Sequence, residues 1–215
     1  MGKPTILLMD NDAMARMALT TLLTKALPDC TMLPAVSQGA DAIRLCTGTA
    51  HPPTVLLADV SMNDINGPLV VRAIRKTNDT TAVLALTASV LANHARDMAD
   101  AGAQGIASKN DDIRLLAVAI HALLQGHTWG DTADVRFDTM QEAHRRVKAE
   151  GTRELSPREI EVVNMWSHGE SLASIAAALG ISEPTVRTQL KRACDKLGVA
   201  DNRALIAAWV KLSTH

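Results

Sequence analysis

Acidic side chains follow two short apolar runs in the first part of the 215-residue chain. Asp10 and Asp12 come directly after the run Thr5–Met9. Asp59 comes directly after the run Val55–Ala58. If both runs are neighbouring parallel strands, these carboxylates meet at one edge of a sheet and repel one another unless a cation lies between them. Magnesium prefers a few such oxygens together with water and a phosphate.

Two further polar side chains end later apolar runs. Thr87 follows the run Val83–Leu86 and offers a hydroxyl, and Lys109 follows Gly105–Ser108 and offers an ammonium. Together with a metal ion, these groups make a place where Asp59 could accept a phosphoryl group. A single acidic residue at a strand end would as readily be a solvated loop start. The order of the whole set favours the phosphoryl site.

The elements that must position this site alternate short apolar runs with helical stretches over residues 1–125. The runs are too short for helices and most are bounded by Asp, Asn, Pro or Gly, so we expect strands. The expected strands are Thr5–Met9, Met32–Val36, Val55–Ala58, Val83–Leu86 and Gly105–Ser108. Uninterrupted apolar strands indicate a parallel sheet buried on both faces. We therefore predict a doubly wound α/β fold with a five-stranded parallel sheet, whose sites lie beyond the carboxyl ends of the strands.

The rest of the chain divides into a polar segment and a helical one. Residues 126–152 are polar and charged, and we interpret them as an interdomain linker that is partly helical. Residues 153–215 contain short helical patterns only, with glycines after the first three helices as stops. The expected helices are Pro157–His168, Leu172–Leu179, Pro184–Leu197 and Asn202–Lys211. We predict a small all-α domain here.

A basic helix is the second feature that could do chemistry. The helices Leu172–Leu179 and Pro184–Leu197, joined by a tight turn, have helix-turn-helix spacing, in which the second helix enters the major groove of DNA. That helix carries four basic residues and one acidic residue, although the whole chain has a net charge of -1. Its amino-terminal half presents Thr185, Arg187, Thr188 and Lys191 on polar faces. The groups placed for phosphates are Arg192, Lys196 and the helix start at Ser182.

Composition excludes several other classes of protein. Apolar residues make up 47% and charged residues 21%, as in an ordinary globular protein. Aromatic residues make up only 2%, which disfavours single-strand binding by stacking. The three cysteines are far apart and form no CxxC pair, which argues against a disulfide framework or a zinc knuckle. Since every apolar run is too short to span a bilayer, we expect a soluble, cytoplasmic protein without a membrane partner.

Residues 1–125 resemble the receiver domain of two-component response regulators. In that family an acidic pair follows the first strand, and the phosphorylated Asp ends the third. A Thr or Ser ends the fourth strand and a Lys ends the fifth. The resemblance implies that a sensor histidine kinase phosphorylates Asp59 and that Thr87 and Lys109 bind the phosphoryl group. The magnesium ligands that it implies are Asp10, Asp59 and the backbone of Ser61.

The chain departs from the receiver pattern at several positions. The second acid of the pair, usually a direct magnesium ligand, is Asn11. Either Asn11 or Asp12 could supply the remaining magnesium ligand, although the shift of one residue to Asp12 changes the direction of the side chain. Two usual prolines are Asn63 and Asn110, and the usual aromatic switch residue is Ile106. An amide ligand removes one negative charge and weakens magnesium binding. A receiver that only dimerises, or senses another signal without phosphorylation, is therefore the alternative.

The segment Leu155–Val210 resembles the LuxR/NarL-type helix-turn-helix domain. The resemblance rests on Leu-Ser-Pro-Arg-Glu-x-Glu-Val-Val, Ile-Ala-x-x-Leu-Gly-Ile-Ser-x-x-Thr-Val-Arg and Lys-Leu-Gly-Val. It implies that Arg187, Thr188 and Lys191 face base edges, while the family's usual His two residues after Arg187 is Gln189. We interpret the chain as a NarL/FixJ-type response regulator that binds double-stranded DNA as a homodimer and is not an enzyme.

A phosphatase of the haloacid dehalogenase type is a remote third interpretation. The triplet Asp10-Asn11-Asp12 after an apolar strand has the spacing of that family's nucleophile and acid. The domain is small, however, and lacks a cap insertion. Lys109 is also too close to Asp111 and Asp112 to complete such a site.

Overall fold

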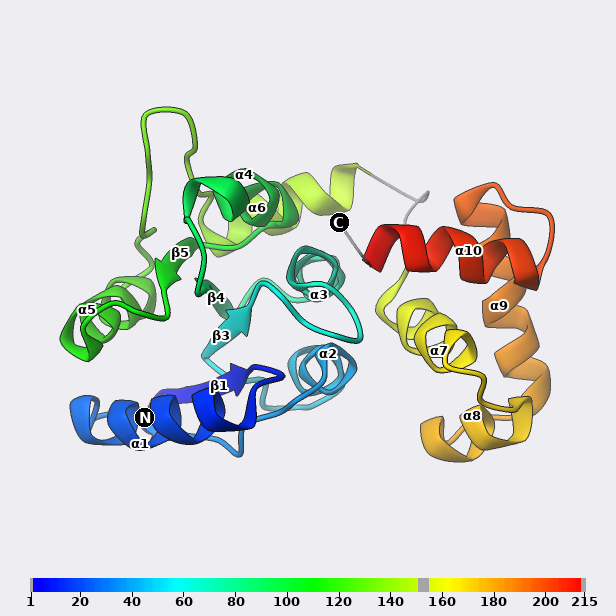
Figure 1. Ribbon diagram of the computed structural model, residues 1–215, viewed down its shortest axis with the longest axis horizontal. Coiled ribbons are helices and arrows are strands. Elements are labelled where there is room, and N and C mark those ends of the chain that lie inside the picture. Colours follow the sequence, from blue (N-terminus) through cyan, green and yellow to red (C-terminus); the bar gives the residue numbers. More distant parts are fainter. Residues whose placement is uncertain (1, 151–154, 214–215) are drawn as a thin grey trace. The chain divides into compact units, whose positions relative to one another are not determined.

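The computed structural model describes residues 2–150 and 155–213, which form two compact units, Met1–Ala149 and Glu150–His215 (Figure 1). Each unit has its own core and is described by itself. The boundary expected between residues 152 and 153 lies outside the described residues. No helix in the described ranges is long and apolar enough to cross a membrane. The cytoplasmic location stays a prediction.

The first unit contains the predicted five-stranded parallel sheet, with strand order β2-β1-β3-β4-β5. The strands are β1 (Thr5–Met9), β2 (Thr31–Met32), β3 (Val55–Asp59), β4 (Ala82–Thr87) and β5 (Gly105–Ser108). Every residue of β3 and β4 is buried, as the uninterrupted apolar runs predicted. Since β1 and β3 are neighbours in parallel register, the residues that follow them lie at the same edge.

The strand β2 is shorter than the expected run Met32–Val36. Leu33 and Val36 still donate backbone hydrogen bonds to β1, and Val36 forms an isolated bridge with Met9. Between them lies Pro34, which has no N–H to donate. The ladder is therefore interrupted after two residues.

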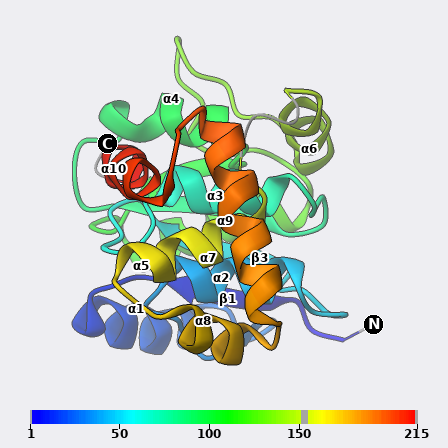
Figure 2. The same ribbon diagram turned by 90° about the vertical axis from the view of Figure 1, so that its right-hand side faces the viewer.

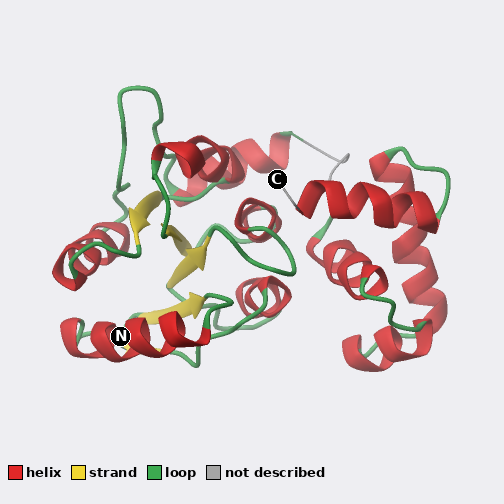
Figure 3. Cartoon of the chain, in the orientation of Figure 1, coloured by secondary structure: helices red, strands yellow, loops and turns green. Residues whose placement is uncertain are grey.

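Helices cover both faces of the sheet, as Figures 1 and 3 show. On one face α1 (Ala13–Ala26) and α5 (Ile113–Leu124) pack against alternate residues of the strands. The other face is covered by α2 (Gly39–Thr47), α3 (Gly67–Arg75) and α4 (Ala92–Ala101). Burial of side chains from both faces of the strands explains why the apolar runs show no alternation.

Residues 126–149, expected as part of a linker, instead cover the sheet edge at β5. The backbone of Trp129 donates to Gln104 O at 3.0 Å and accepts from Ile106 N–H at 3.3 Å, which forms a parallel bridge with Gly105. The two backbones approach so closely that a Cβ on Gly105 would lie 2.6 Å from Trp129 O. We call residues 127–149 the strap.

The strap ends in α6 (Met140–Ala149), which packs on α3. Phe137, Ala143 and Val147 are buried, and Trp129 and Met140 are partly buried against the core. Arg146 fixes the helix by donating to the carbonyl oxygens of Ala99 and Asp100, both at 2.8 Å. These apolar side chains are scattered among many polar and charged ones, so the composition resembles that of a solvated linker, which is why the sequence suggested one.

A fully buried arginine at the end of α3 joins several loops of the first unit. The Arg75 guanidinium donates to Gly102 O, Asn78 O, Thr81 O and Gln104 Oε1 at 2.8–3.0 Å. Its own carbonyl accepts a bond from His144 of α6 at 2.7 Å if the imidazole Nδ1 carries the proton. Burial lowers the pKa of Arg75 to about 10, which still leaves the guanidinium charged at neutral pH. Carbonyl and amide oxygens, rather than a carboxylate, therefore solvate this buried charge.

The second unit consists of the predicted short helices, shown in Figure 2. They are α7 (Pro157–Ser167), α8 (Leu172–Leu179), α9 (Glu183–Leu197) and α10 (Asn202–Ser213). Ser156 and Glu159 form the expected capping box at the start of α7. Ser171 and Ser182 cap α8 and α9, and Gly180 ends α8 in the left-handed conformation. These local signals explain why helix ends in this unit agree with the sequence within two residues.

Replacement of the buried arginine tests its structural role. Arg75→Ala leaves three carbonyl oxygens without their donor and opens a cavity, so we expect the first unit to lose at least about 3 kcal/mol of unfolding free energy. Urea denaturation followed by circular dichroism measures the loss. The control is Arg44→Ala, whose side chain is 56% exposed and pairs with Asp41. We expect that control to change stability by less than about 1 kcal/mol. Equal losses in the two variants would contradict the role of Arg75.

Candidate phosphoryl site and nucleic-acid interface

Two carboxylates and one ammonium gather at the carboxyl edge of the sheet. Lys109 Nζ lies 2.8 Å from Asp10 Oδ2 and 3.0 Å from Asp59 Oδ1. The Asp10 side chain is fully buried and the Asp59 side chain is 4% exposed. The expected convergence of Asp10 and Asp59 is thus present, and the cation between them is the chain's own lysine.

The ion pairs hold the lysine in its charged form. Burial lowers the pKa of the Lys109 ammonium, but its contacts with the Asp10 and Asp59 carboxylates outweigh burial and raise the pKa above its ordinary value. With both acids ionised, the cluster keeps one net negative charge. This charge is available to attract a further cation.

Asp12 has a different role from the cluster. Its carboxylate accepts the backbone N–H groups of Met14 at 2.7 Å and Ala15 at 3.1 Å, and so caps α1. The hydrogen bonds from Ala15 and Met14 lower the pKa of this exposed carboxyl. Because the cap holds the Asp12 carboxylate at the start of α1, this role competes with binding a metal in place of the acid that Asn11 lacks. The one-residue shift changes the direction of the side chain, as the sequence suggested.

The donor set at this edge fits a magnesium ion with fewer charges than the receiver pattern has. Asp10 Oδ2 is buried and has the Lys109 ion pair but no hydrogen bond of regular geometry, so a cation could satisfy it. The other donors expected from the sequence are Asp59, the backbone of Ser61 and either Asn11 or Asp12. Over residues 2–150 and 155–213, no cluster of three or more His, Cys, Asp or Glu side chains is arranged to hold a metal.

The loop after Asp59 closes tightly over the end of β3. The N–H of Ser61 donates to Asp59 Oδ1 at 3.2 Å, and Gly67 N–H donates to Val60 O at 3.0 Å. A Cβ on Gly67 would lie 2.8 Å from the Asp59 carbonyl oxygen. Glycine at the start of α3 therefore allows the two backbones to lie in direct contact next to Asp59.

Thr87 belongs to a chain of polar side chains that sequence reasoning missed. Its carbonyl accepts the Lys109 N–H at 2.8 Å, which places the ends of β4 and β5 together. Thr87 Oγ1 lies 3.1 Å from Ser89 Oγ, and Ser89 Oγ lies 2.7 Å from His94 Nε2. The sequence signals for Ser89 and His94 were only a hydroxyl two residues after Thr87 and a histidine on the next helix.

Ile106 occupies the place of the aromatic switch residue and is buried. It is 2% exposed, and its N–H donates to Trp129 O of the strap. Asn110 makes a long contact from its amide Nδ2 to Ala88 O, at 3.5 Å. In β5, an aliphatic side chain thus stands where the receiver pattern has an aromatic one, and the strap pairs with the backbone of this residue.

The polar face of α9 carries the residues expected to contact DNA. Arg187, Thr188, Lys191 and Arg192 are exposed, whereas Val186, Leu190 and Ala193 are buried. Ser182 caps the helix by accepting the Thr185 N–H at 3.3 Å, and Thr188 Oγ1 donates to Pro184 O at 2.9 Å. Arg187 lies 3.9 Å from Glu183 in an exposed ion pair. The structure therefore brings the expected cationic groups to one accessible side of α9.

Lys196 differs from the other predicted phosphate-binding residues. Its Nζ lies 2.7 Å from Glu159 Oε2, and the Glu159 side chain is only 3% exposed. The same Glu159 oxygen accepts the Ser156 N–H in the capping box. Lys196 thus joins α9 to the start of α7 and compensates a buried carboxylate, a role that competes with phosphate binding.

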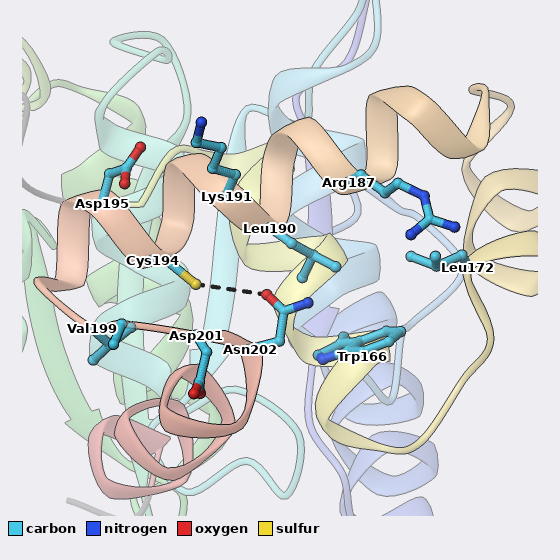
Figure 4. A pocket seen from close by; sticks show the side chains of 11 residues that line it. Trp166, Leu172, Arg187, Leu190, Lys191, Cys194, Asp195, Val199, Asp201 and Asn202 are labelled. Atoms are coloured by element: carbon cyan, nitrogen blue, oxygen red, sulfur yellow. Dashed lines mark hydrogen bonds between the residues drawn. The ribbon is translucent and has the colours of Figure 1, made fainter.

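A pocket of about 390 Å³ lies beside α9 in the second unit (Figure 4). Arg187 and Lys191 border it together with Trp166, and Cys194 Sγ points toward Asn202 Oδ1 at 3.7 Å. Exposed cationic side chains of α9 thus border a pocket that is also lined by aromatic, acidic and amide groups.

Comparison with known proteins finds similarity over both units. Residues 6–121 match the family "Response regulator receiver domain", and residues 153–208 match "Bacterial regulatory proteins, luxR family". The nitrate/nitrite response regulator protein NarL of Escherichia coli (strain K12) is 27% identical over 210 residues, which cover 96% of this chain and 94% of NarL.

Two further relatives extend the comparison. A transcriptional regulatory protein named NarL from Mycobacterium tuberculosis (strain ATCC 25618 / H37Rv) is 31% identical over 169 residues, 79% of this chain and 76% of that protein. A solved structure of the Salmonella typhimurium RcsB response regulator has a TM-score of 0.53 at 22% identity and covers 96% of this chain and 98% of that chain. This structural likeness supports the fold alone.

Replacement of Asp12 distinguishes its role as the cap of α1 from a role in metal binding. Asp12→Ala should lower the unfolding free energy by about 1 kcal/mol, the usual effect of removing an N-cap. Magnesium affinity, measured by calorimetric titration, should stay unchanged. Asp112→Ala is the matched control because Asp112 caps α5 through the Arg114 N–H. A loss of magnesium affinity in Asp12→Ala alone would show that Asp12 is a ligand.

Proposed function

Since the chain belongs to the two-component response regulators that join a receiver domain to a LuxR-type helix-turn-helix domain, we propose that it is controlled by phosphorylation. In this proposal a sensor histidine kinase phosphorylates Asp59 and the second unit binds double-stranded DNA as a homodimer through α9. The observation that carries the first part is the buried contact of Lys109 with both Asp10 and Asp59.

The proposed chemistry is transfer of a phosphoryl group to Asp59. An Asp59 carboxylate oxygen bonds to phosphorus while the bond from phosphorus to the donor histidine nitrogen breaks, and that nitrogen keeps the electron pair. Lys109 balances negative charge on the phosphoryl oxygens, and the Thr87 hydroxyl donates a hydrogen bond to one of them. A bound magnesium ion would supply further charge neutralisation, held by Asp10, Asp59, the Ser61 backbone and Asn11.

Control without phosphorylation is the second candidate function. Its support is the reduced charge of the site, since Asn11 is neutral and Asp12 caps α1. In this alternative the first unit only dimerises or responds to another signal. The phosphatase interpretation has no support in the geometry, because the Asp10 carboxylate is fully buried and paired with Lys109.

The DNA-binding part of the proposal rests on α9. Arg187, Thr188 and Lys191 are exposed near its amino-terminal half, the part of a recognition helix that contacts base edges. Arg192 and the helix start at Ser182 are placed for phosphates. A single short helix with so few cations gives only modest affinity, which favours a homodimer on two half-sites.

Labelling with acetyl phosphate and magnesium tests phosphorylation. We expect the wild-type protein to be labelled and Asp59→Asn to stay unlabelled, since the acceptor oxygen is lost. Asn11→Asp should label faster at low magnesium because it restores an anionic ligand. Intact-protein mass spectrometry measures the labelled fraction. Labelling of Asn11→Asp but not of the wild type would favour the phosphorylation-independent alternative.

Gel-shift titrations with a DNA fragment selected by the wild-type protein test α9. Arg187→Ala and Lys191→Ala should each weaken binding about tenfold, as expected for loss of a base or phosphate contact. The control is Arg203→Ala, which removes an exposed charge of the same sign from α10. Unchanged affinity in both α9 variants, or an equal loss in Arg203→Ala, would contradict the proposed recognition helix.

A further inference from the structure

A continuous hydrogen-bonded chain leads from the candidate phosphoryl site to α4. Thr87, which is 2% exposed at the end of β4, accepts the Ser89 N–H at 3.1 Å. The two hydroxyl oxygens are 3.1 Å apart, and the Ser89 oxygen is 2.7 Å from His94 Nε2. His94 lies in the first turn of α4. The chain therefore joins the end of a strand at the site to the start of a surface helix.

The direction of these hydrogen bonds is set by the number of available protons. A hydroxyl has one proton, so it donates one hydrogen bond and accepts others. Without a phosphoryl group, Thr87 can donate to Ser89, and Ser89 can donate to an unprotonated His94 Nε2. When the Thr87 proton turns to a phosphoryl oxygen, Thr87 can only accept from Ser89. If the Ser89 hydroxyl then donates to Thr87, it accepts from His94, and this requires a proton on Nε2.

The start of α4, like that of α2, has no capping side chain at its N-cap position. Its N-cap position, Leu91, makes no side-chain cap hydrogen bond, whereas Asp12, Asn66 and Asp112 cap the starts of α1, α3 and α5. The bond between Ser89 and His94 spans this uncapped start. A change in its direction is therefore a change in how α4 is held to β4.

We infer that His94 is a positioning residue for phosphorylation of Asp59, acting through Ser89 on the Thr87 hydroxyl, and that the phosphoryl group selects the His94 tautomer with a proton on Nε2. The inference rests on the proposed function, since it needs a phosphoryl group at Asp59. By this inference, α4 responds to phosphorylation of Asp59 through His94. This response does not need the aromatic side chain whose place Ile106 occupies.

Nitrogen NMR of the full-length protein with isotope-labelled histidine reads the tautomer directly. After labelling with acetyl phosphate and magnesium, the His94 Nε2 signal should move to the position of a protonated ring nitrogen. In Ser89→Ala the signal should not respond, because the chain is broken. A wild-type protein that is labelled without any change in the His94 signal would overturn the inference.

Labelling rates of matched variants give the second measurement. His94→Leu and Ser89→Ala should be labelled about two- to tenfold more slowly, the effect of one misdirected hydrogen bond. His94→Gln keeps a side chain that can donate or accept and should restore the rate. Asn93→Leu places the same exposed leucine one residue earlier on α4 and should be labelled at the wild-type rate.

The outcomes separate the two proposals. If the wild-type protein is labelled at Asp59 and His94→Leu matches its rate, the role of His94 fails and the proposed function stands. If the wild-type protein is not labelled at Asp59, the proposed phosphorylation fails, and the role of His94 fails with it. Slow labelling of His94→Leu and Asn93→Leu alike would assign the effect to the helix surface and would also overturn the inference.

Discussion

Two ionised carboxylates that are buried side by side at the end of a sheet repel each other unless a positive charge lies between them, and here Lys109 provides that charge. The constraint requires three strands to end at the same level and in the right order. It explains the placement of Asp10 after β1, Asp59 at the end of β3 and Lys109 after β5. It also restricts function, because a site that is already partly neutralised has limited attraction for a second cation. The candidate phosphoryl site is therefore built around the lysine as much as around the acids.

The sequence predicted the elements well because their signals are local. Buried parallel strands appear as continuous apolar runs, and the first three helices of the second unit begin after a Ser and end near a Gly. The convergence of Asp10 and Asp59 was expected on the condition that their strands are neighbours, which the strand order confirms. Asp12 was open between two roles, because a shift of one residue decides whether a carboxylate faces a helix end or a site. The ion pair of Lys196 with Glu159 was not foreseen because the two residues lie 37 positions apart in the sequence.

Polar groups that are buried without a charged partner give the first unit much of its specificity. Arg75 donates to carbonyl and amide oxygens of the two loops that precede β4 and β5. Thr87 belongs to a chain of hydroxyl and imidazole groups. Composition and periodicity do not reveal such networks, since each member is a common residue in an ordinary position. Both networks meet α4 or the loop that follows it. The helix that carries His94 is thus held at each end by polar contacts rather than by a capping side chain at its start.

The strap has a consequence for how the sheet meets other chains. An open sheet has two edges, and an exposed edge can accept a strand from another molecule. At the β5 edge, the strap already pairs with the sheet through the bridge between Trp129 and Gly105. At the other edge β2 is two residues long, and Pro34 interrupts its ladder. Neither edge therefore presents a long unpaired strand to which another chain could add a strand.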